Sequence, residues 1–81
     1  MEEKVIVVFN FRGEKRDIEI PTSITANELV FGLNKGYQLG IDINKPEDCY
    51  LRAENPVVLI KGETTLGELG IRNGTTIFYE R

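Results

Sequence analysis

Hydrophobic residues are concentrated near the start of the chain. Residues 4–11 read Lys-Val-Ile-Val-Val-Phe-Asn-Phe and are rich in the β-branched and aromatic side chains that favour strands. Both alternating sets of this segment are apolar at their centre, whereas a half-buried strand alternates one apolar set with one polar set. The pattern predicts a strand with apolar side chains on both faces, and the second face is the main question about function.

The following strand alternates cleanly. A polar segment at 12–15 that contains a glycine predicts a hairpin turn. Residues 16–20 then predict a strand with Ile18 and Ile20 pointing inward. Pro21 ends this strand because proline cannot donate a hydrogen bond to the ladder.

A helix is predicted from the capping motif at residues 25–28. The Thr25 hydroxyl can accept from the backbone N–H of Glu28, and the Glu28 carboxylate can accept from that of Thr25. Gly40 is expected to end the helix as a left-handed cap. Apolar residues recur at helical spacing and predict one buried stripe: Ala26, Leu29, Val30, Leu33 and Tyr37.

Three residues of this helix do not follow the stripe. Phe31 points well away from it, where a large apolar side chain buries nothing within the domain. Gly32 and Gly36 each cost about 1 kcal/mol relative to alanine in a helix interior. We interpret the two glycines as places where a neighbouring loop approaches the helix closely.

The remainder of the chain predicts one loop, three short strands and a turn. The loop covers 41–48 with Ile41 and Ile43 as apolar anchors, and the strands cover 49–54, 57–60 and 75–80, with Leu51 and Ala53 inward in the first of them. Residues 65–68 repeat the Thr-x-x-Glu motif and predict a single helical or 3₁₀ turn. One helix can bury only one face of a sheet, so the other face meets solvent, a partner or a second copy.

Length and charge narrow the classes of function. The 81 residues leave room for one small domain, and a net charge of −3 without a basic cluster argues against nucleic acid as a partner. No apolar run approaches the roughly 18 residues that span a bilayer. Residues 1–4 lack the features of a secretory signal, so we expect a cytoplasmic protein that does not insert into a membrane.

The residue types needed for catalysis are scarce. The sequence contains no histidine, which removes the usual general base and the commonest zinc ligand. The single cysteine, Cys49, begins a predicted strand, and we interpret it as a small structural hydrophobe. Neither glycine-rich nucleotide motif occurs. We therefore expect no enzymatic activity, no cofactor and no metal site.

The order of elements resembles the ubiquitin β-grasp over the whole chain. The resemblance rests on a glycine turn in the first hairpin, the Thr-capped helix and the segment Leu66-x-x-Leu69-Gly70-Ile71-x-Asn73-Gly74 before the last strand. It implies an α+β fold in which a mixed sheet of four to five strands packs on one helix, as a single ubiquitin-like domain over residues 1–81.

Within that fold, the chain most resembles the YukD/EsaB family. These are small ubiquitin-like proteins of Gram-positive type VII (WXG100) secretion systems, and the shared features are the length and the Leu-x-x-Leu-Gly-Ile-x-Asn-Gly signature. The resemblance implies a cytosolic accessory protein without enzymatic activity. Its expected partners are proteins, in particular membrane components of the secretion apparatus.

Two other functions are compatible with a β-grasp domain. One is an auxiliary subunit of a multicomponent bacterial monooxygenase. The other is a covalent modifier or sulfur carrier, which needs a flexible C-terminal Gly-Gly pair for activation. The sequence finishes Phe78-Tyr79-Glu80-Arg81, so we expect that it is not conjugated.

The open face of the sheet is the predicted site of partner binding. Placing the chain on the ubiquitin fold by its glycine turn and helix cap puts four side chains under the helix: Ile6, Val8, Ile18 and Ile20. The open face is then expected to carry the other apolar set of the first strand together with one residue of the last strand: Val5, Val7, Phe9, Phe11 and Phe78. Phe31 on the helix is a further candidate for partner binding. Homodimerisation through the same face is the alternative to a separate partner.

Overall fold

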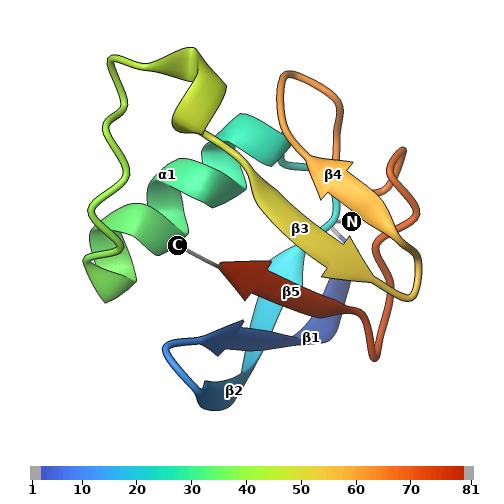
Figure 1. The fold of residues 1–81 in the computed structure, drawn as a ribbon. Coiled ribbons are helices and arrows are strands. Elements are labelled where there is room, and N and C mark those ends of the chain that lie inside the picture. Colours follow the sequence, from blue (N-terminus) through green and yellow to red (C-terminus); the bar gives the residue numbers. More distant parts are fainter. Residues whose placement is uncertain (1–2, 80–81) are drawn as a thin grey trace.

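A hairpin of two long strands begins the fold. In the computed structural model, which describes residues 3–79, β1 spans Lys4–Phe11 and β2 spans Glu14–Pro21 (Figure 1). Arg12 and Gly13 form the turn with φ angles of 51° and 78°, and a two-residue hairpin turn of type I′ requires positive values at both positions. The turn is shorter than the predicted one at 12–15, and β2 is correspondingly longer.

The helix begins at the predicted cap. α1 spans Ala26–Tyr37, and the hydroxyl of Thr25 accepts a hydrogen bond from the Glu28 N–H at 3.2 Å. The Glu28 carboxylate accepts one from the Thr25 N–H at 3.0 Å. This capping box is confirmed, and it satisfies N–H groups that the start of a helix leaves without an intrahelical partner.

The helix ends earlier than predicted. Gln38 is the cap, with a left-handed φ of 53°, and donates its N–H to the carbonyl of Asn34. Gly40 also has a positive φ, 78°, but lies two residues beyond this cap. The Asn34 side chain then accepts from the N–H of Ile41 at 2.9 Å and donates to its carbonyl at 3.0 Å. Leu39 and Ile41 are both buried, so the early turn returns two apolar side chains to the core.

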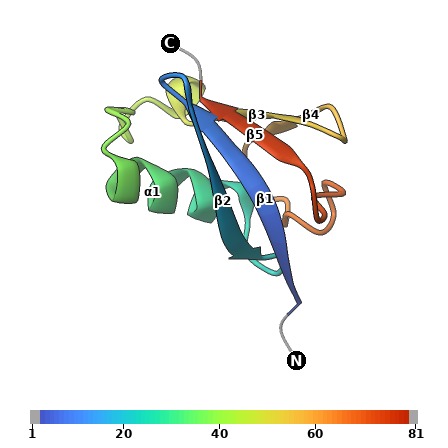
Figure 2. The same ribbon diagram turned by 90° about the horizontal axis from the view of Figure 1, so that it is seen from below.

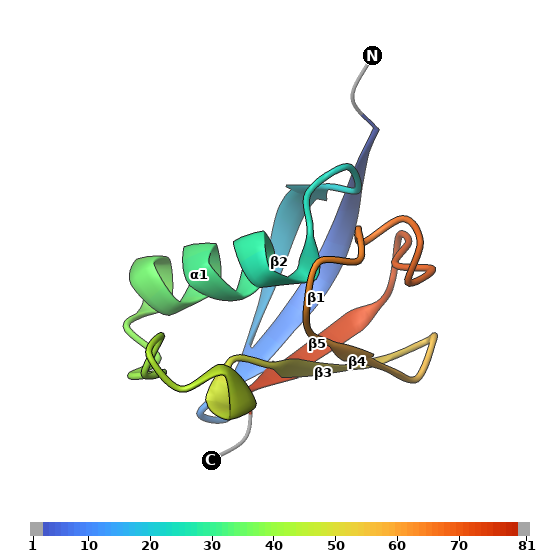
Figure 3. The same ribbon diagram turned by 90° about the horizontal axis from the view of Figure 1, so that it is seen from above.

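Three shorter strands complete a mixed five-stranded sheet. They are β3 at Leu51–Glu54, β4 at Val58–Ile60 and β5 at Thr76–Tyr79, and a 3₁₀ helix, η1, at Pro46–Asp48 precedes β3. The strand order is β2-β1-β5-β3-β4, with β1 and β5 parallel and the other neighbours antiparallel. Figures 2 and 3 show α1 lying across one face of this sheet, whereas no α-helix of the described chain covers the other.

Within residues 3–79, no helix combines the length and the apolar character needed to cross a bilayer.

The two faces of β1 are the reverse of the prediction. The side chains predicted for the open face lie in the core beneath α1 and are at most 9% exposed: Val5, Val7, Phe9 and Phe11. Of the set predicted to lie under the helix, Ile6 is 51% exposed and Val8 is half-buried. The partner-binding role predicted for the first set is therefore wrong, because a partner cannot reach side chains that the domain itself buries.

The register of the hairpin explains this reversal. Val5 lies opposite Ile20 and Val7 opposite Ile18, and residues directly opposite each other in an antiparallel pair share a face. A turn of two residues and a turn of four residues both place odd-numbered positions of β1 opposite even-numbered positions of β2. Ile20 is buried and Ile18 packs against the core, as predicted, and their position requires Val5 and Val7 to point inward as well.

Aromatic side chains pack together at the hairpin end of β1. The Phe9 and Phe11 rings are stacked with centroids 5.1 Å apart, and the Tyr37 ring of α1 lies 5.0 and 5.2 Å from them. Such pairs contribute roughly 0.5–1.5 kcal/mol beyond the area that they bury. The Tyr79 hydroxyl donates to the carbonyl of Leu39 at 2.9 Å, which ties β5 to the segment after the helix.

The predicted core positions of β3 and of the helical stripe are confirmed. Leu51 and Ala53 point inward from β3, and Cys49 is buried with its thiol 3.4 Å from the carbonyl of Lys45. Tyr37 is partly buried at the end of the helical stripe, and the rest of that stripe is fully in the core: Ala26, Leu29, Val30 and Leu33.

The second Thr-x-x-Glu motif packs beside the first. The Glu68 N–H donates to the Thr65 hydroxyl at 3.2 Å, and that hydroxyl donates to the Glu68 carboxylate at 2.9 Å. The Leu69 N–H donates to the Thr65 carbonyl at 3.1 Å, and the Gly70 N–H donates to the Gly67 carbonyl at 3.0 Å. These are bonds of the α-helical and 3₁₀ type, so the predicted single turn is confirmed. A bridge between Thr25 and Thr65, together with a 2.8 Å bond from the Ala26 N–H to the Thr64 carbonyl, joins this turn to the start of α1.

Two other predictions near the helix are corrected. A Cβ placed at Gly32 or Gly36 would find no atom within 4 Å outside the helix's own adjacent backbone, and both residues are exposed. The predicted close approach of a loop is therefore wrong. In the loop that follows the helix, Ile41 is the buried anchor that was predicted, whereas Ile43 is exposed.

Candidate functional site on the open face of the sheet

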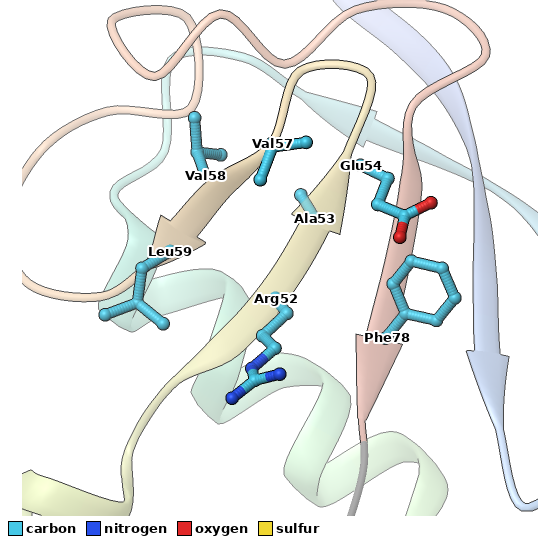
Figure 4. Close-up of a pocket in the computed structure, with 7 residues that line it drawn as sticks. All are labelled: Arg52, Ala53, Glu54, Val57, Val58, Leu59 and Phe78. Atoms are coloured by element: carbon cyan, nitrogen blue, oxygen red, sulfur yellow. The ribbon is translucent and has the colours of Figure 1, made fainter.

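The open face of the sheet, opposite α1, carries an apolar groove at its β3–β4–β5 end. Figure 4 shows the residues around it, which come from β3, β5 and the segment through the β3–β4 turn into β4. The groove has a volume of about 350 Å³ and seven lining residues: Arg52, Ala53, Glu54, Val57, Val58, Leu59 and Phe78. We call it the open-face groove.

Strand register brings the central residues of this groove into one row. Phe78 lies opposite Arg52, and Arg52 lies opposite Leu59. Ile77 is fully buried on the other face of β5, and successive side chains of a strand alternate, so Phe78 must point to the open face. Asn10 of β1 continues the row on the far side of Phe78.

Apolar side chains in this groove remain accessible. Val57, in the turn before β4, is 85% exposed, and Leu59 is 51% exposed. Phe78 is half-buried between its neighbours. The domain therefore leaves two apolar side chains exposed and a third half-buried around one concavity, whereas scattered single apolar residues are normal on a protein surface.

The other end of the same face is charged. Val8 lies opposite Asp17, and Ile6 lies opposite Glu19, across β1 and β2. Carboxylates thus stand beside each apolar side chain of β1 that faces away from the helix. This mixture is typical of a solvated sheet face, so the contiguous apolar surface is confined to the β3–β4–β5 end.

The groove carries one positive and one negative side chain. Within residues 3–79, neither Arg52 nor Glu54 has a hydrogen-bond or ion-pair partner for its charged group, and the ion pair recorded there joins Arg16 to Glu14 on the hairpin. Both groove charges are therefore available to a bound molecule. No group of three or more Cys, Asp or Glu side chains in the described part of the chain is arranged to hold a metal ion. The groove offers binding chemistry, with apolar walls and two opposite charges.

The predicted site residues do not come together. Phe78 lines the open-face groove, whereas Phe31 is exposed on the outer side of α1 and lines a different groove. Sequence reasoning missed Val57 and Leu59. The signal was present, because residues 57–60 are apolar in both alternating sets, and an inward Ile60 requires Leu59 to point outward.

A comparison with protein families identifies the group to which this chain belongs. A family model described as "WXG100 protein secretion system (Wss), protein YukD" matches residues 4–78. The chain belongs to the YukD family. This membership confirms the predicted resemblance and connects the ubiquitin-like domain with a WXG100 secretion system. No curated protein matches the sequence.

Several solved structures of ubiquitin-like domains have the same fold as this chain. The ubiquitin-like domain of tubulin-binding cofactor B has a TM-score of 0.72 at 18% identity, covering 96% of this chain and 89% of that one. The C-terminal ubiquitin-like domain of mouse tubulin-specific chaperone e has a TM-score of 0.72 at 11% identity, with 95% and 84% covered. The UBL domain of Plasmodium falciparum Dsk2 has a TM-score of 0.61 at 16% identity, with 96% and 100% covered. At these identities the likeness shows the fold alone, and the predicted ubiquitin-like β-grasp is confirmed.

Proposed function

We propose that this member of the YukD family is a non-catalytic, cytoplasmic component of a WXG100 secretion system. It acts as a single ubiquitin-like domain that binds protein partners noncovalently through the open-face groove. Its partners are membrane-bound components of the secretion apparatus, contacted on their cytoplasmic side.

One observation carries this proposal. Val57 and Leu59 stay exposed and Phe78 is only half-buried around one concavity, although burying side chains of this size stabilises a structure by roughly 1.5–3 kcal/mol each. Apolar side chains gathered in this way, and rimmed by charges such as Arg52, are typical of a protein-binding surface. The β1–β2 end of the same face lacks this arrangement.

A matched pair of variants tests the proposal. Leu59 and Ile6 are both 51% exposed aliphatic residues on the open face, but only Leu59 lines the groove. We expect Leu59→Asp to lower copurification of the secretion-apparatus membrane components with the tagged protein by at least about tenfold, because a desolvated carboxylate replaces an apolar contact. Ile6→Asp should leave copurification unchanged.

Circular dichroism and urea unfolding of both variants control for loss of the fold. Equal copurification by both variants, or equal loss by both with native folds, would contradict the proposal. Sedimentation of the wild-type protein at micromolar concentration gives a further control. A dimer that Leu59→Asp converts to a monomer would assign the groove to a second copy and would also contradict it.

A further inference from the structure

A second apolar groove lies on the helix side of the molecule and shares no residue with the open-face groove. In Figure 1 the chain leaves the end of α1, runs up beside it and passes through η1 before it enters β3. α1, this loop and the segment after β4 enclose about 220 Å³ with seven lining residues: Asn27, Phe31, Ile43, Pro46, Cys49, Lys61 and Gly62. We call this the helix-side groove.

The walls of the helix-side groove are apolar and accessible. Phe31 is 47% exposed and Ile43 is 57% exposed, and Pro46 also lines the groove. Phe31 and Ile43 come from different elements, and neither has a role in the core. Two large apolar side chains that take no part in the core therefore line the same concavity.

The side-chain polar groups of this groove that have no partner within residues 3–79 are hydrogen-bond donors. The Asn27 side-chain oxygen accepts from the Gly62 N–H at 3.1 Å, and the Asn27 backbone N–H donates to the Gly62 carbonyl at 2.9 Å. The Asn27 NH₂ group has no hydrogen-bond partner within residues 3–79. Lys61 is exposed, has no ion-pair partner there and is the only charged residue among the seven that line the groove. Free donors beside an apolar wall suit a carboxylate attached to an apolar group.

Size decides between the kinds of occupant. Pockets that enclose a small-molecule ligand usually measure roughly 300–1,000 Å³, so this groove is smaller than a typical cofactor or substrate site. A stable dimer buries roughly 800 Å² per partner, far more than seven lining residues supply. The space fits one or two side chains of an extended peptide.

We propose that the helix-side groove binds a short acidic and apolar peptide segment of a partner protein. An apolar side chain of that segment packs between Phe31 and Ile43, and a neighbouring carboxylate binds Lys61 and the Asn27 NH₂ group. The net charge of the whole chain is −3, so the attraction is local to the groove and does not extend to the rest of the surface.

Synthetic peptides test this proposal by NMR titration of the ¹⁵N-labelled protein. The first probe is Gly-Ser-Glu-Leu-Gly, acetylated and amidated so that glutamate carries its only charge. The second has glutamine in place of glutamate and is therefore uncharged. The third also has glutamine at this position, but its C-terminal carboxylate is free. We expect the first probe to move the amide signals of Asn27, Phe31, Ile43 and Gly62 in a saturable way. The second should bind more weakly by roughly two- to fivefold, the range for an exposed ion pair.

Three variants assign the contacts. Lys61→Gln should abolish the difference between the glutamate and glutamine probes. Lys35→Gln alters an exposed lysine on α1 that does not line the groove, and it should preserve the difference. Phe31→Ala should weaken both probes by roughly tenfold through lost apolar contact. Phe31 is exposed and alanine is a strong helix former, so this variant should fold normally.

Each result bears on the proposal. Binding of the third probe but not the first would support it, with a chain terminus as the source of the carboxylate. Measurable but equal binding of the first two probes, preserved discrimination in Lys61→Gln, or movement of the Leu59 and Phe78 signals instead would overturn it. Absence of a saturable shift with any of the three probes up to about 10 mM peptide would also overturn it. Movement of the same signals on concentrating the protein without peptide would assign the groove to a second copy, against the proposal.

Discussion

The covered and the open face of β1 carry similar β-branched side chains but lie in different surroundings. Val7 is fully buried beneath α1, whereas Val8, the next residue along the same strand, faces away from the helix and is half-buried. Phe9 then returns to the core. Apolar character is therefore necessary for a core position but does not identify one. The element that lies over each face, and the register that orients the strand toward it, make the difference.

The largest expected effect on stability comes from comparing two phenylalanines, one on each face of the sheet. Phe9 is fully buried, and Phe9→Ala should lower the free energy of unfolding by about 3–5 kcal/mol through lost contacts and a cavity. Phe78 lies on the open face, and Phe78→Ala should lower it by about 1 kcal/mol or less. Urea unfolding followed by far-ultraviolet circular dichroism measures both. Similar losses at the two positions would contradict the assignment of the faces.

A smaller and more closely matched effect comes from adjacent valines. Val7→Thr places a hydroxyl in the apolar core without a hydrogen-bond partner, and it should lower the free energy of unfolding by about 1–3 kcal/mol. Val8→Thr places the same hydroxyl on the open face, where water can reach it, and the change should stay within about 0.5 kcal/mol. The same urea titration compares them. A larger loss for Val8→Thr would mean that the open face is covered in solution.

The smallest effect concerns the uncovered side of α1. Gly32→Ala and Gly36→Ala should each stabilise the protein by up to about 1 kcal/mol, because alanine is the better helix former and neither Cβ meets a neighbour. For a domain of this size, 1 kcal/mol raises the melting temperature by roughly 4–8 °C. Gly13→Ala is the control: its φ of 78° disfavours alanine, so its melting temperature should fall. A fall for the helix variants would indicate that a neighbour does approach those glycines.

Local signals predicted the elements of this fold well. The capping box at Thr25 and Glu28 lies where the spacing placed it, and the apolar stripe of α1 is buried. The end of the helix was misplaced because it depends on a contact outside the local pattern. Asn34 binds the backbone of Ile41, and this turn allows Leu39 to reach the core.

The candidate site was predicted only in part. Phe78 was placed correctly on the open face, but its neighbours in the groove come from β3 and β4, and Leu59 was not among the expected residues. The wrong prediction of which face of β1 is buried has a different cause. An even-numbered turn already implied that Val7 shares a face with Ile18, and alignment to the ubiquitin fold by turn and cap did not use that constraint.

By itself the sequence determined the features that depend on a few neighbouring residues: the strands, the capped helix, the hairpin turn and the signature that connects the chain with the YukD family. Capping hydrogen bonds and side-chain alternation act over short separations, so spacing is enough to predict them. Only the tertiary structure decided which apolar side chains are buried and which gather around grooves. Those outcomes depend on register between strands far apart in the chain, such as β1 with β5 and β3 with β5, and on the single helix that covers one face of the sheet.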